Sequence, residues 1–213
     1  MILRGMVPVF VALASVAVGA GAATAIDIIS YTGNPDNICA QQPSTGTVSN
    51  PGVCRTDNSS WTYYMDSSGE FMLEPEDRAV TTNGMEAWDN ATVVTASLDS
   101  SPTFSGNAET DVIFQEGKIP GFPDWVDGAT WCEDRVNGTD YQCDQHYVRI
   151  RGAGVYSKWL VAHESGHSLG LVHGTEAQPP TTGTASVMGI MTTGSLPSSL
   201  GATPIAKVDG TYN

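Results

Sequence analysis

Basic side chains are scarce in this chain of 213 residues, which has 9 Lys and Arg against 23 Asp and Glu and a formal net charge of −14 at pH 7. So acidic a surface argues against binding to nucleic acid or to anionic membranes, because both attract clustered Lys and Arg. The sequence also lacks internal repeats, long low-complexity tracts and runs of like charge. It is long enough for one domain with a real core, with or without a short extension.

Long apolar runs are missing except near the N-terminus. There Arg4 precedes an apolar run from Val7 to Val18, and Ala23-Thr24-Ala25 fits a small-residue cleavage site. We interpret residues 1–25 as a signal peptide, cleaved after Ala25 or alternatively after Ala22 or Ala23. A membrane anchor is the competing interpretation, but the run is short, rich in Ala and Gly, and followed by no stop-transfer charges. No later segment is long enough to span a bilayer, so we predict a secreted, extracellular protein.

Cysteine is rare as well, but the residues form an even set of four, Cys39, Cys54, Cys132 and Cys143. An even number in an exported chain predicts two disulfides. Three pairings exist, and we favour Cys39–Cys54 and Cys132–Cys143. Each of these closes a loop of about a dozen residues, worth about 3 kcal/mol in the chain-entropy model.

Histidine is equally rare, yet three of the four residues lie in one stretch. His163, Glu164, His167, Gly170 and His173 fill the pattern H-E-x-x-H-x-x-G-x-x-H. The first two histidines are four residues apart, so on a helix they share one face and can share a metal ion. Glu164 suits a carboxylate that deprotonates water at that metal without being a ligand. Gly170 lies where a helix can end in a left-handed residue, which would turn His173 towards the same metal.

Three histidine ligands leave a coordination position open, as expected of catalytic zinc rather than a closed structural site. A helix through the motif is supported by Ser157, a plausible N-cap, and by apolar Trp159, Leu160 and Val161. The alternative is that these are ordinary surface histidines. Five fixed residue types over eleven positions argue against that reading.

The segments before the motif predict strand, helix, three strands, a further strand and then the motif helix. The predicted strands are Trp61–Met65, Val93–Leu98, Asp111–Phe114, Gly128–Cys132 and His146–Arg151. The predicted helix covers Pro75–Asn90, with one face formed by Val80, Gly84, Ala87, Trp88 and Ala91. In the last strand, Val148 and Ile150 alternate with Arg149 and Arg151, which predicts one buried face.

The motif, followed by Ser186-Val-Met-Gly-Ile-Met191, resembles the metzincin clan of zinc endopeptidases, and within it a matrixin-like, secreted microbial member. The resemblance implies that His163, His167 and His173 bind one catalytic zinc and that Glu164 is the general base. It also implies that Met188 is the Met-turn residue beneath the metal, with Met191 as the alternative.

The fold that the resemblance implies is α+β, a metzincin-like catalytic domain over residues 60–213. It has a mixed, mostly parallel twisted sheet with an antiparallel edge strand, two main helices and an irregular C-terminal subdomain. Pro197 and Pro204 predict that any helix after the Met-turn is short. Residues 26–59 form an N-terminal extension with the Cys39–Cys54 disulfide. Because matrixin prodomain cysteines cap the zinc, a free thiolate at Cys39 or Cys54 is the alternative.

The edge strand Gly128–Cys132 would pair with an extended substrate, although an ordinary protected edge is an equal alternative. We therefore expect a monomeric, secreted zinc metalloendopeptidase, a hydrolase that acts on protein or peptide substrates and binds neither nucleic acid nor a membrane. Two alternatives from other classes are a non-catalytic zinc-binding or adhesive protein, and a zinc hydrolase of non-peptide amides or esters.

A second, His-rich zinc site is not expected, because only His146 remains, and we interpret it as an ordinary strand residue. Calcium is the other candidate cofactor. Its candidate ligands are Asp111, Asp124, Asp127, Glu133, Asp134, Asp140 and Asp144. They show no EF-hand spacing, so solvated surface acids are the alternative reading.

Overall fold

The computed structural model describes residues 54–119, 121–139, 141–152, 154–173, 191 and 198–213. The elements are β1 (Arg55–Thr56), β2 (Ser60–Met65), α1 (Pro75–Asp89), β3 (Thr95–Leu98), β4 (Val112–Glu116), β5 (Gly128–Arg135), β6 (Gln142–Ile150), α2 (Lys158–Ser168) and α4 (Ala202–Tyr212). The expected signal peptide and most of the expected extension lie outside the described residues. The element order agrees with the expected order, with β1 and α4 in addition.

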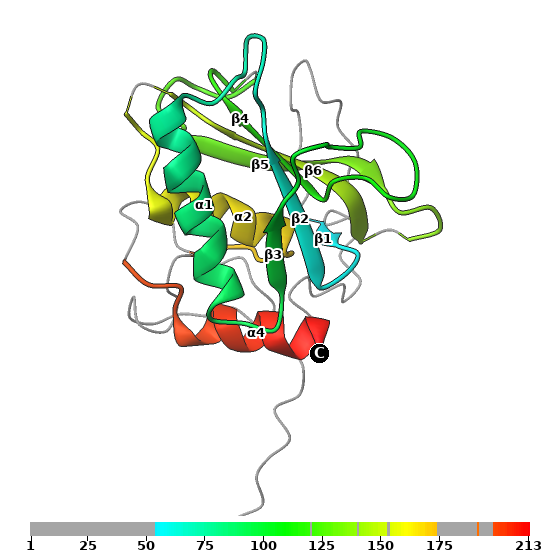
Figure 1. Ribbon diagram of the computed structural model, residues 1–213. Coiled ribbons are helices and arrows are strands. Elements are labelled where there is room, and N and C mark those ends of the chain that lie inside the picture. The colour runs from blue at the N-terminus through cyan, green and yellow to red at the C-terminus, as the bar shows by residue number, and fades with distance from the viewer. Residues whose placement is uncertain (1–53, 120, 140, 153, 174–190, 192–197) are drawn as a thin grey trace, which may run out of the picture.

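Six strands form one mixed sheet, with the order β1-β6-β4-β2-β3 and with β5 paired to β6 (Figure 1). Every pairing is parallel except that of β5 with β6, which is antiparallel. In the described part of the chain β5 pairs with no second strand, so it forms an edge. The α+β class and the mostly parallel sheet are therefore confirmed, together with an antiparallel strand at the edge.

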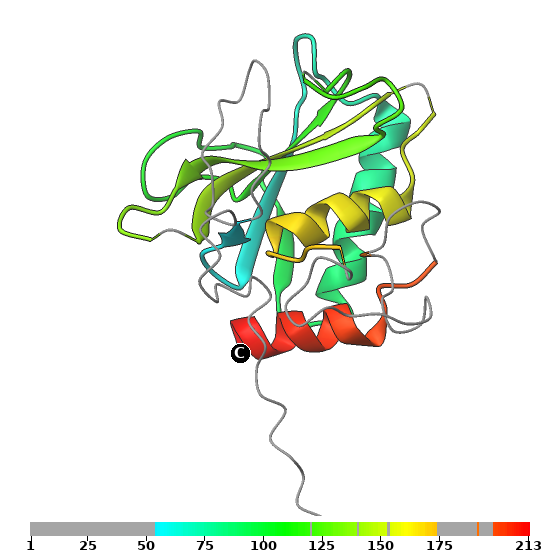
Figure 2. The ribbon, with the colours of Figure 1, turned by 180° about the vertical axis from the view of Figure 1, so that it is seen from behind.

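The main core lies between the sheet and the helices, where α2 runs beneath β5 and β6 (Figure 2). Trp61, Phe114 and Val148 from the sheet are fully buried there against Trp88 of α1 and Val161 of α2. Side chains at i and i+2 of a strand share a face, so the strand contributions come from alternate positions. This burial of large apolar side chains is the main force that holds α1 and α2 against the sheet.

The other face of β6 is buried as well, contrary to the expectation of one buried face for this strand. Trp131 and Tyr147 stack there with ring centroids 5.8 Å apart. Arg149 is 1% exposed, with its guanidinium 3.7 Å from the centroid of the Phe71 ring. It also donates hydrogen bonds to Gln115 Oε1. The arginine was expected to face solvent, and it is buried because an aromatic ring and a side-chain amide cover it.

α1 begins at Pro75 and ends at Asp89, within a residue of the expected bounds. Its buried face is rotated from the expected one. The buried residues are Asp77, Thr81, Gly84, Met85 and Trp88. Of the two polar residues in this face, Thr81 is satisfied by donating its hydroxyl hydrogen to the Asp77 backbone carbonyl, at 2.8 Å.

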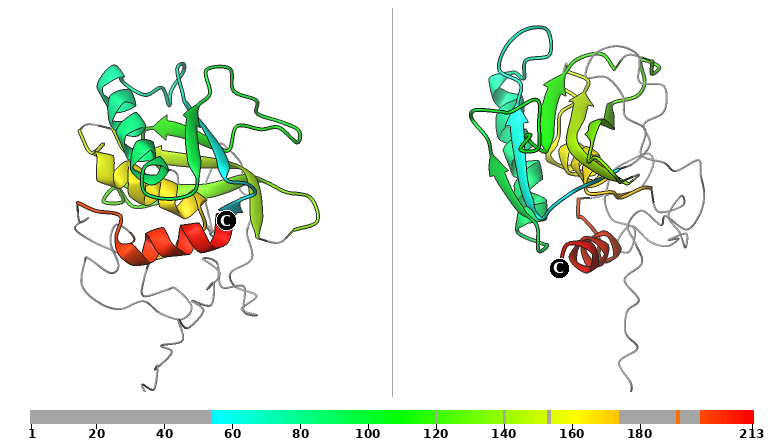
Figure 3. Two further views of the ribbon diagram at one scale, coloured as in Figure 1. Left: turned by 60° about the horizontal axis from the view of Figure 1, so that its bottom comes forward. Right: turned by 90° about the vertical axis from the view of Figure 1, so that its right-hand side faces the viewer.

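The C-terminal region contains an eleven-residue helix, α4, so the expectation of only a short helix there is wrong. The helix starts at Ala202, beyond Pro197, and Pro204 falls within its first turn. A proline in the first turn removes no intrahelical hydrogen bond, because those N–H groups have no helical partner. α4 crosses the end of the molecule opposite the sheet, and its last turn lies beside β1 (Figure 3). There the Tyr212 hydroxyl donates to the carbonyls of Thr56 and Leu169.

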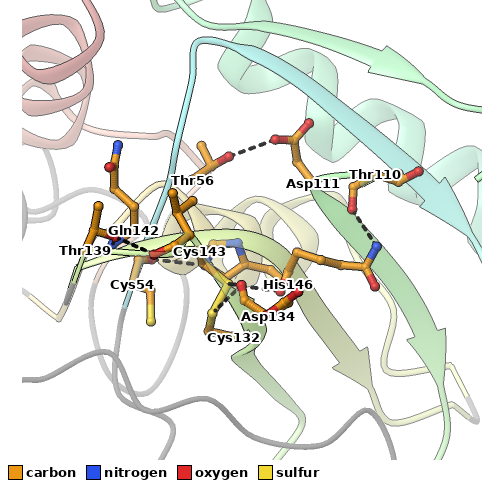
Figure 4. Close-up of a disulfide and its surroundings, with 12 residues drawn as sticks. Cys54, Thr56, Thr110, Asp111, Cys132, Asp134, Thr139, Gln142, Cys143 and His146 are labelled. Atoms are coloured by element: carbon orange, nitrogen blue, oxygen red, sulfur yellow. Dashed lines mark hydrogen bonds between the residues drawn. A yellow bond between two sulfur atoms is a disulfide. The ribbon is translucent and has the colours of Figure 1, made fainter. Parts of the chain in front are cut away.

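The predicted disulfide between Cys132 and Cys143 is confirmed. It joins β5 to β6, which form a hairpin longer than expected, because β5 continues to Arg135. Cys54 is buried beside this pair and is also disulfide-bonded, so it is not a free thiolate (Figure 4). Cys39, the partner predicted for it, lies outside the described residues.

Replacing Gly84 with Ala should destabilise the fold, although Ala is the better helix former by about 1 kcal/mol. Gly84 lies where α1 crosses α2, and a methyl group there would come within 2.6 Å of Val161 Cβ. Because Val161 is fully buried and stiff, we expect a loss of about 1–3 kcal/mol in the free energy of unfolding, measured by urea denaturation. Asn83→Ala, at an exposed position in the same helix, is the control. If the Gly84→Ala protein were as stable as wild type, α1 and α2 could move apart at this crossing without loss of unfolding free energy, which would contradict the prediction.

Candidate metal centre

The motif helix is α2, which carries His163, Glu164 and His167. The predicted N-cap is confirmed, because the Ser157 hydroxyl accepts a hydrogen bond from the Leu160 backbone N–H at 3.1 Å. The middle of the helix is held by a buried hydrogen bond from Trp88 Nε1 to the Ala162 carbonyl, at 2.9 Å. The helix is therefore anchored to α1 one residue before the first motif histidine.

The chain turns sharply at the end of α2, as the position of Gly170 predicts. Gly170 has φ of 90°, in the left-handed region that favours glycine. Its backbone N–H donates to the His167 carbonyl at 2.9 Å, and the Leu171 N–H donates to the Gly166 carbonyl at 3.0 Å. These two bonds form a Schellman motif. The turn reverses the chain and carries His173 back towards the helix.

The three motif histidines come together at one point. His163 Nε2 lies 3.3 Å from His167 Nε2 and 3.3 Å from His173 Nε2. One nitrogen from each ring lies within 4.8 Å of the others, an arrangement that can hold a metal ion. The sequence places these residues in one motif, and the structure brings all three to one point.

The ring of His167 is fixed by its second nitrogen, since His167 Nδ1 lies 2.6 Å from the Leu171 carbonyl oxygen. A carbonyl can only accept, so Nδ1 carries the hydrogen and Nε2 presents its lone pair to the cluster. Burial and the proximity of His163 and His173 lower the pKa of His167 well below its usual value, which keeps the ring neutral. Neutral imidazole is the form that ligates a metal, so the donor set fits a divalent ion such as zinc.

Glu164 is buried directly beside the cluster, with 4% of its surface exposed. Burial raises the pKa of its carboxyl to about 7, while the hydrogen bond from Thr130 and the charge of His173 act in the opposite direction. Thr130 Oγ1 lies 3.0 Å from Glu164 Oε2 and 2.7 Å from its backbone carbonyl oxygen. The sequence motif identifies Glu164 but not Thr130. The contact of Thr130 depends on how β5 lies against α2, which no local sequence pattern indicates.

A methionine lies beneath the motif helix. Met191 is 2% exposed, and a methyl group added at Gly166 would come within 2.7 Å of its Sδ. Gly166 lies between the two helical histidines, so the methionine packs against the backbone of the turn that carries them. Of the two Met-turn candidates, Met191 is therefore the one described at this position. Met188 lies outside the described residues.

Asp140 lies outside the described residues, and the other candidate calcium ligands form no shared site in the described part of the chain, where the histidine cluster is joined by only one other convergent group. Asp111 is buried and accepts hydrogen bonds from the hydroxyls of Thr56 and Thr62. Asp124 pairs with exposed Lys118. The other group is Glu74, Asp77 and Glu116, none of which was expected as a ligand. Burial, followed by repulsion from neighbouring carboxylates, raises the pKa of Asp77 to about 6.

His146, the fourth histidine, lies apart from the cluster within β6. It is 1% exposed, and its Nε2 lies 3.1 Å from the Cys54 carbonyl oxygen, to which it donates. Burial lowers the pKa of His146 to about 4, so the ring is neutral at physiological pH. The residue therefore has a structural role, because its ring links β6 to Cys54 beside the disulfide (Figure 4).

Comparison with known proteins assigns no family to this chain. No protein-family model matches it, and a search of the curated proteins finds no match either. Among the described helices, none has the length and apolar character needed to cross a membrane. The chemistry of the site therefore has to be argued from its own residues.

Replacing His146 with Gln should make stability less sensitive to acid. The folded-state pKa is about 4 and the unfolded value about 6.5, so between these values only the unfolded state binds the proton. The buried neutral ring therefore contributes up to about 3 kcal/mol to the free energy of unfolding, and this contribution is lost as pH falls from about 6.5 to 4. Urea denaturation from pH 4 to 7 measures this, and Gln keeps an N–H for the Cys54 carbonyl. A stability difference between the two proteins that does not vary with pH would contradict the assignment.

Proposed function

We propose that this protein is a secreted zinc-dependent endopeptidase that hydrolyses peptide bonds with Glu164 as general base. The observation that carries the proposal is the convergence of three imidazole nitrogens beside a buried carboxylate, next to an edge strand. Each part has a separate role in such a reaction: ligation, proton transfer and substrate alignment.

His163, His167 and His173 are the proposed zinc ligands. Three nitrogen donors, with no fourth protein donor beside them among the described residues, suit a catalytic site with a position left open. A zinc ion held there would supply a Lewis acid that activates water and polarises a carbonyl group. The hydrogen bond from His167 Nδ1 to the Leu171 carbonyl supports this role, because it orients the ring and raises its basicity.

Glu164 is the proposed proton carrier. It follows the first ligand on the same helix, so its carboxylate lies beside the ligand set and need not join it. In the proposed reaction, Glu164 takes a proton from the attacking water and delivers it to the leaving amine as the C–N bond breaks. Its burial supports this role, because a pKa of about 7 suits a group that must both accept and release a proton near neutral pH.

β5 is the proposed alignment surface for the substrate. Its outer edge pairs with no strand in the described part of the chain, and an extended peptide could add there as a further strand. Such pairing uses main-chain hydrogen bonds, so it selects for a peptide but little for its sequence. An antiparallel fourth strand in the run before the motif helix is also what the metzincin resemblance implies, which supports the same proposal.

Two further features fit the proposal. Met191 packs beneath the turn of α2 between the histidines, where the resemblance implies a Met-turn residue. The Cys132–Cys143 disulfide fits an oxidising compartment, in agreement with the expected signal peptide over residues 1–25. We propose that the mature protein acts outside the cell as a monomer on protein or peptide substrates.

Replacing Glu164 with Ala should abolish hydrolysis and leave metal binding intact. The measurement is cleavage of denatured casein by both proteins, with and without a zinc chelator, together with the zinc content of each. We expect about one zinc per molecule in both proteins and chelator-sensitive cleavage by the wild type alone. Zinc in both with activity in neither would favour a binding protein, and cleavage of small esters but not casein would favour a non-peptide hydrolase. Equal activity of both proteins would refute the role of Glu164.

Replacing His173 with Ala should weaken metal binding itself. One of three nitrogens is lost, and no other histidine of the four in the chain can replace it, because His146 is buried within β6. We expect zinc affinity to fall, measured by competition with a chromogenic chelator, and activity to return partly in excess zinc. His146→Gln is the matched histidine control and should retain wild-type affinity. Unchanged affinity in the His173 variant would exclude it as a ligand.

A further inference from the structure

β5 contacts the Glu164 carboxylate at two positions on its inner face. Positions 128 and 130 share that face because strand side chains alternate, and it is the face that packs against α2. Gly128 and Thr130 are the residues at these positions. Neither belongs to the histidine motif, and the chain between them and Glu164 includes all of β6.

The first contact is a hydrogen bond. The Thr130 hydroxyl has one hydrogen, and both oxygens near it, Glu164 Oε2 at 3.0 Å and the Glu164 carbonyl at 2.7 Å, act as acceptors. Among the described residues Thr130 is the only hydrogen-bond donor to this carboxylate. One hydroxyl therefore contacts both ends of the same glutamate, its backbone and its charged tip, and limits the side chain to few rotamers.

The second contact is steric. A methyl group added at Gly128 would come within 2.5 Å of Glu164 Oε1 and 2.8 Å of Glu164 Cδ. Contacts this close do not occur in folded proteins, so the carboxylate occupies space that only glycine leaves free. With Thr130 at one carboxylate oxygen and Gly128 at the other, moving the group away from Thr130 loses the hydrogen bond, and a side chain at position 128 would displace it.

We infer that β5 positions the general base: Thr130 orients the Glu164 carboxylate, and Gly128 provides the space in which it lies. This inference rests on the proposed endopeptidase function and adds two positioning residues to it. A base must be held within a fraction of an ångström of its working position, because small displacements cost large factors in rate. β5, the strand expected to align the substrate, thus also aligns the base. The same strand therefore sets the positions of both groups.

The test is the kinetics of Thr130→Val and Thr130→Ser beside the wild type. Val has nearly the same shape without the hydroxyl, and Ser keeps the hydroxyl. We expect Thr130→Val to lower kcat by about 10- to 100-fold, the range typical of residues that orient a ligand or base, with KM and zinc content near wild type. Thr130→Ser should recover most of the activity. The recovery is the decisive readout, because a merely structural threonine would not depend on the hydroxyl.

Gly128→Ala displaces the same carboxylate by crowding its other oxygen, Glu164 Oε1. This second variant keeps the proposal testable if Thr130→Val fails to fold. It should lower kcat with zinc content unchanged. The matched control is Thr110→Val, which removes another buried threonine hydroxyl that donates to a carboxylate, Asp99 Oδ2, at 2.7 Å. It should lower the melting temperature and leave kcat unchanged.

The possible outcomes separate the two proposals. If the zinc-loaded wild type does not cleave denatured protein, the proposed function fails whatever Thr130 does. If the wild type cleaves and both Thr130→Val and Gly128→Ala retain its kcat, the positioning role alone is overturned. Equal losses of kcat in the Val, Ser and Thr110 variants would assign Thr130 a structural role and would also overturn it.

Discussion

Three imidazole nitrogens held close together are the constraint that the rest of this structure serves. The Nε2 atoms of His167 and His173 each lie 3.3 Å from that of His163. Three rings from two separate segments meet at this point, so the surrounding chain must hold each of them in place. Trp88 anchors α2 through the Ala162 carbonyl, and the glycine turn after the helix fixes where the third ring arrives. A site prepared in this way would lose little conformational entropy on binding a metal ion.

The two helices explain how that rigidity arises from ordinary packing. α1 and α2 approach closely because Gly84 offers no side chain at their crossing, and Val161 fills the space against it. The same principle recurs at Gly166, where the helix backbone meets Met191, and at Gly128, where a strand meets Glu164. Three glycines in three different elements thus set three short distances around one site. At each glycine a neighbouring group packs directly against the backbone instead of against a side chain. This close packing leaves little freedom for α2 to shift.

The sequence predicts the local parts of this structure well and the distant contacts poorly. Ser157 and Gly170 are identifiable at the two ends of α2 because caps and turns depend on residues within a few positions. Arg149 could not be placed correctly, since its burial depends on Phe71, far away in the chain. The contact of Thr130 with Glu164 depends on how β5 aligns with α2, and no local pattern encodes that alignment. The length of α4 cannot be predicted from Pro197 and Pro204 alone. Whether a proline ends a helix or fits its first turn depends on where the helix begins.

The packing of Met191 links the site to redox chemistry in an unexpected way. A thioether that is 2% exposed and packed against Gly166 is shielded from oxidants in the folded protein. An oxidant therefore reaches this sulfur only in molecules whose structure has opened locally, and the sulfoxide formed there is larger, polar and unable to return to its site. Resistance to oxidation should thus depend on how rarely the packing beneath α2 opens, rather than on how many methionines the chain contains.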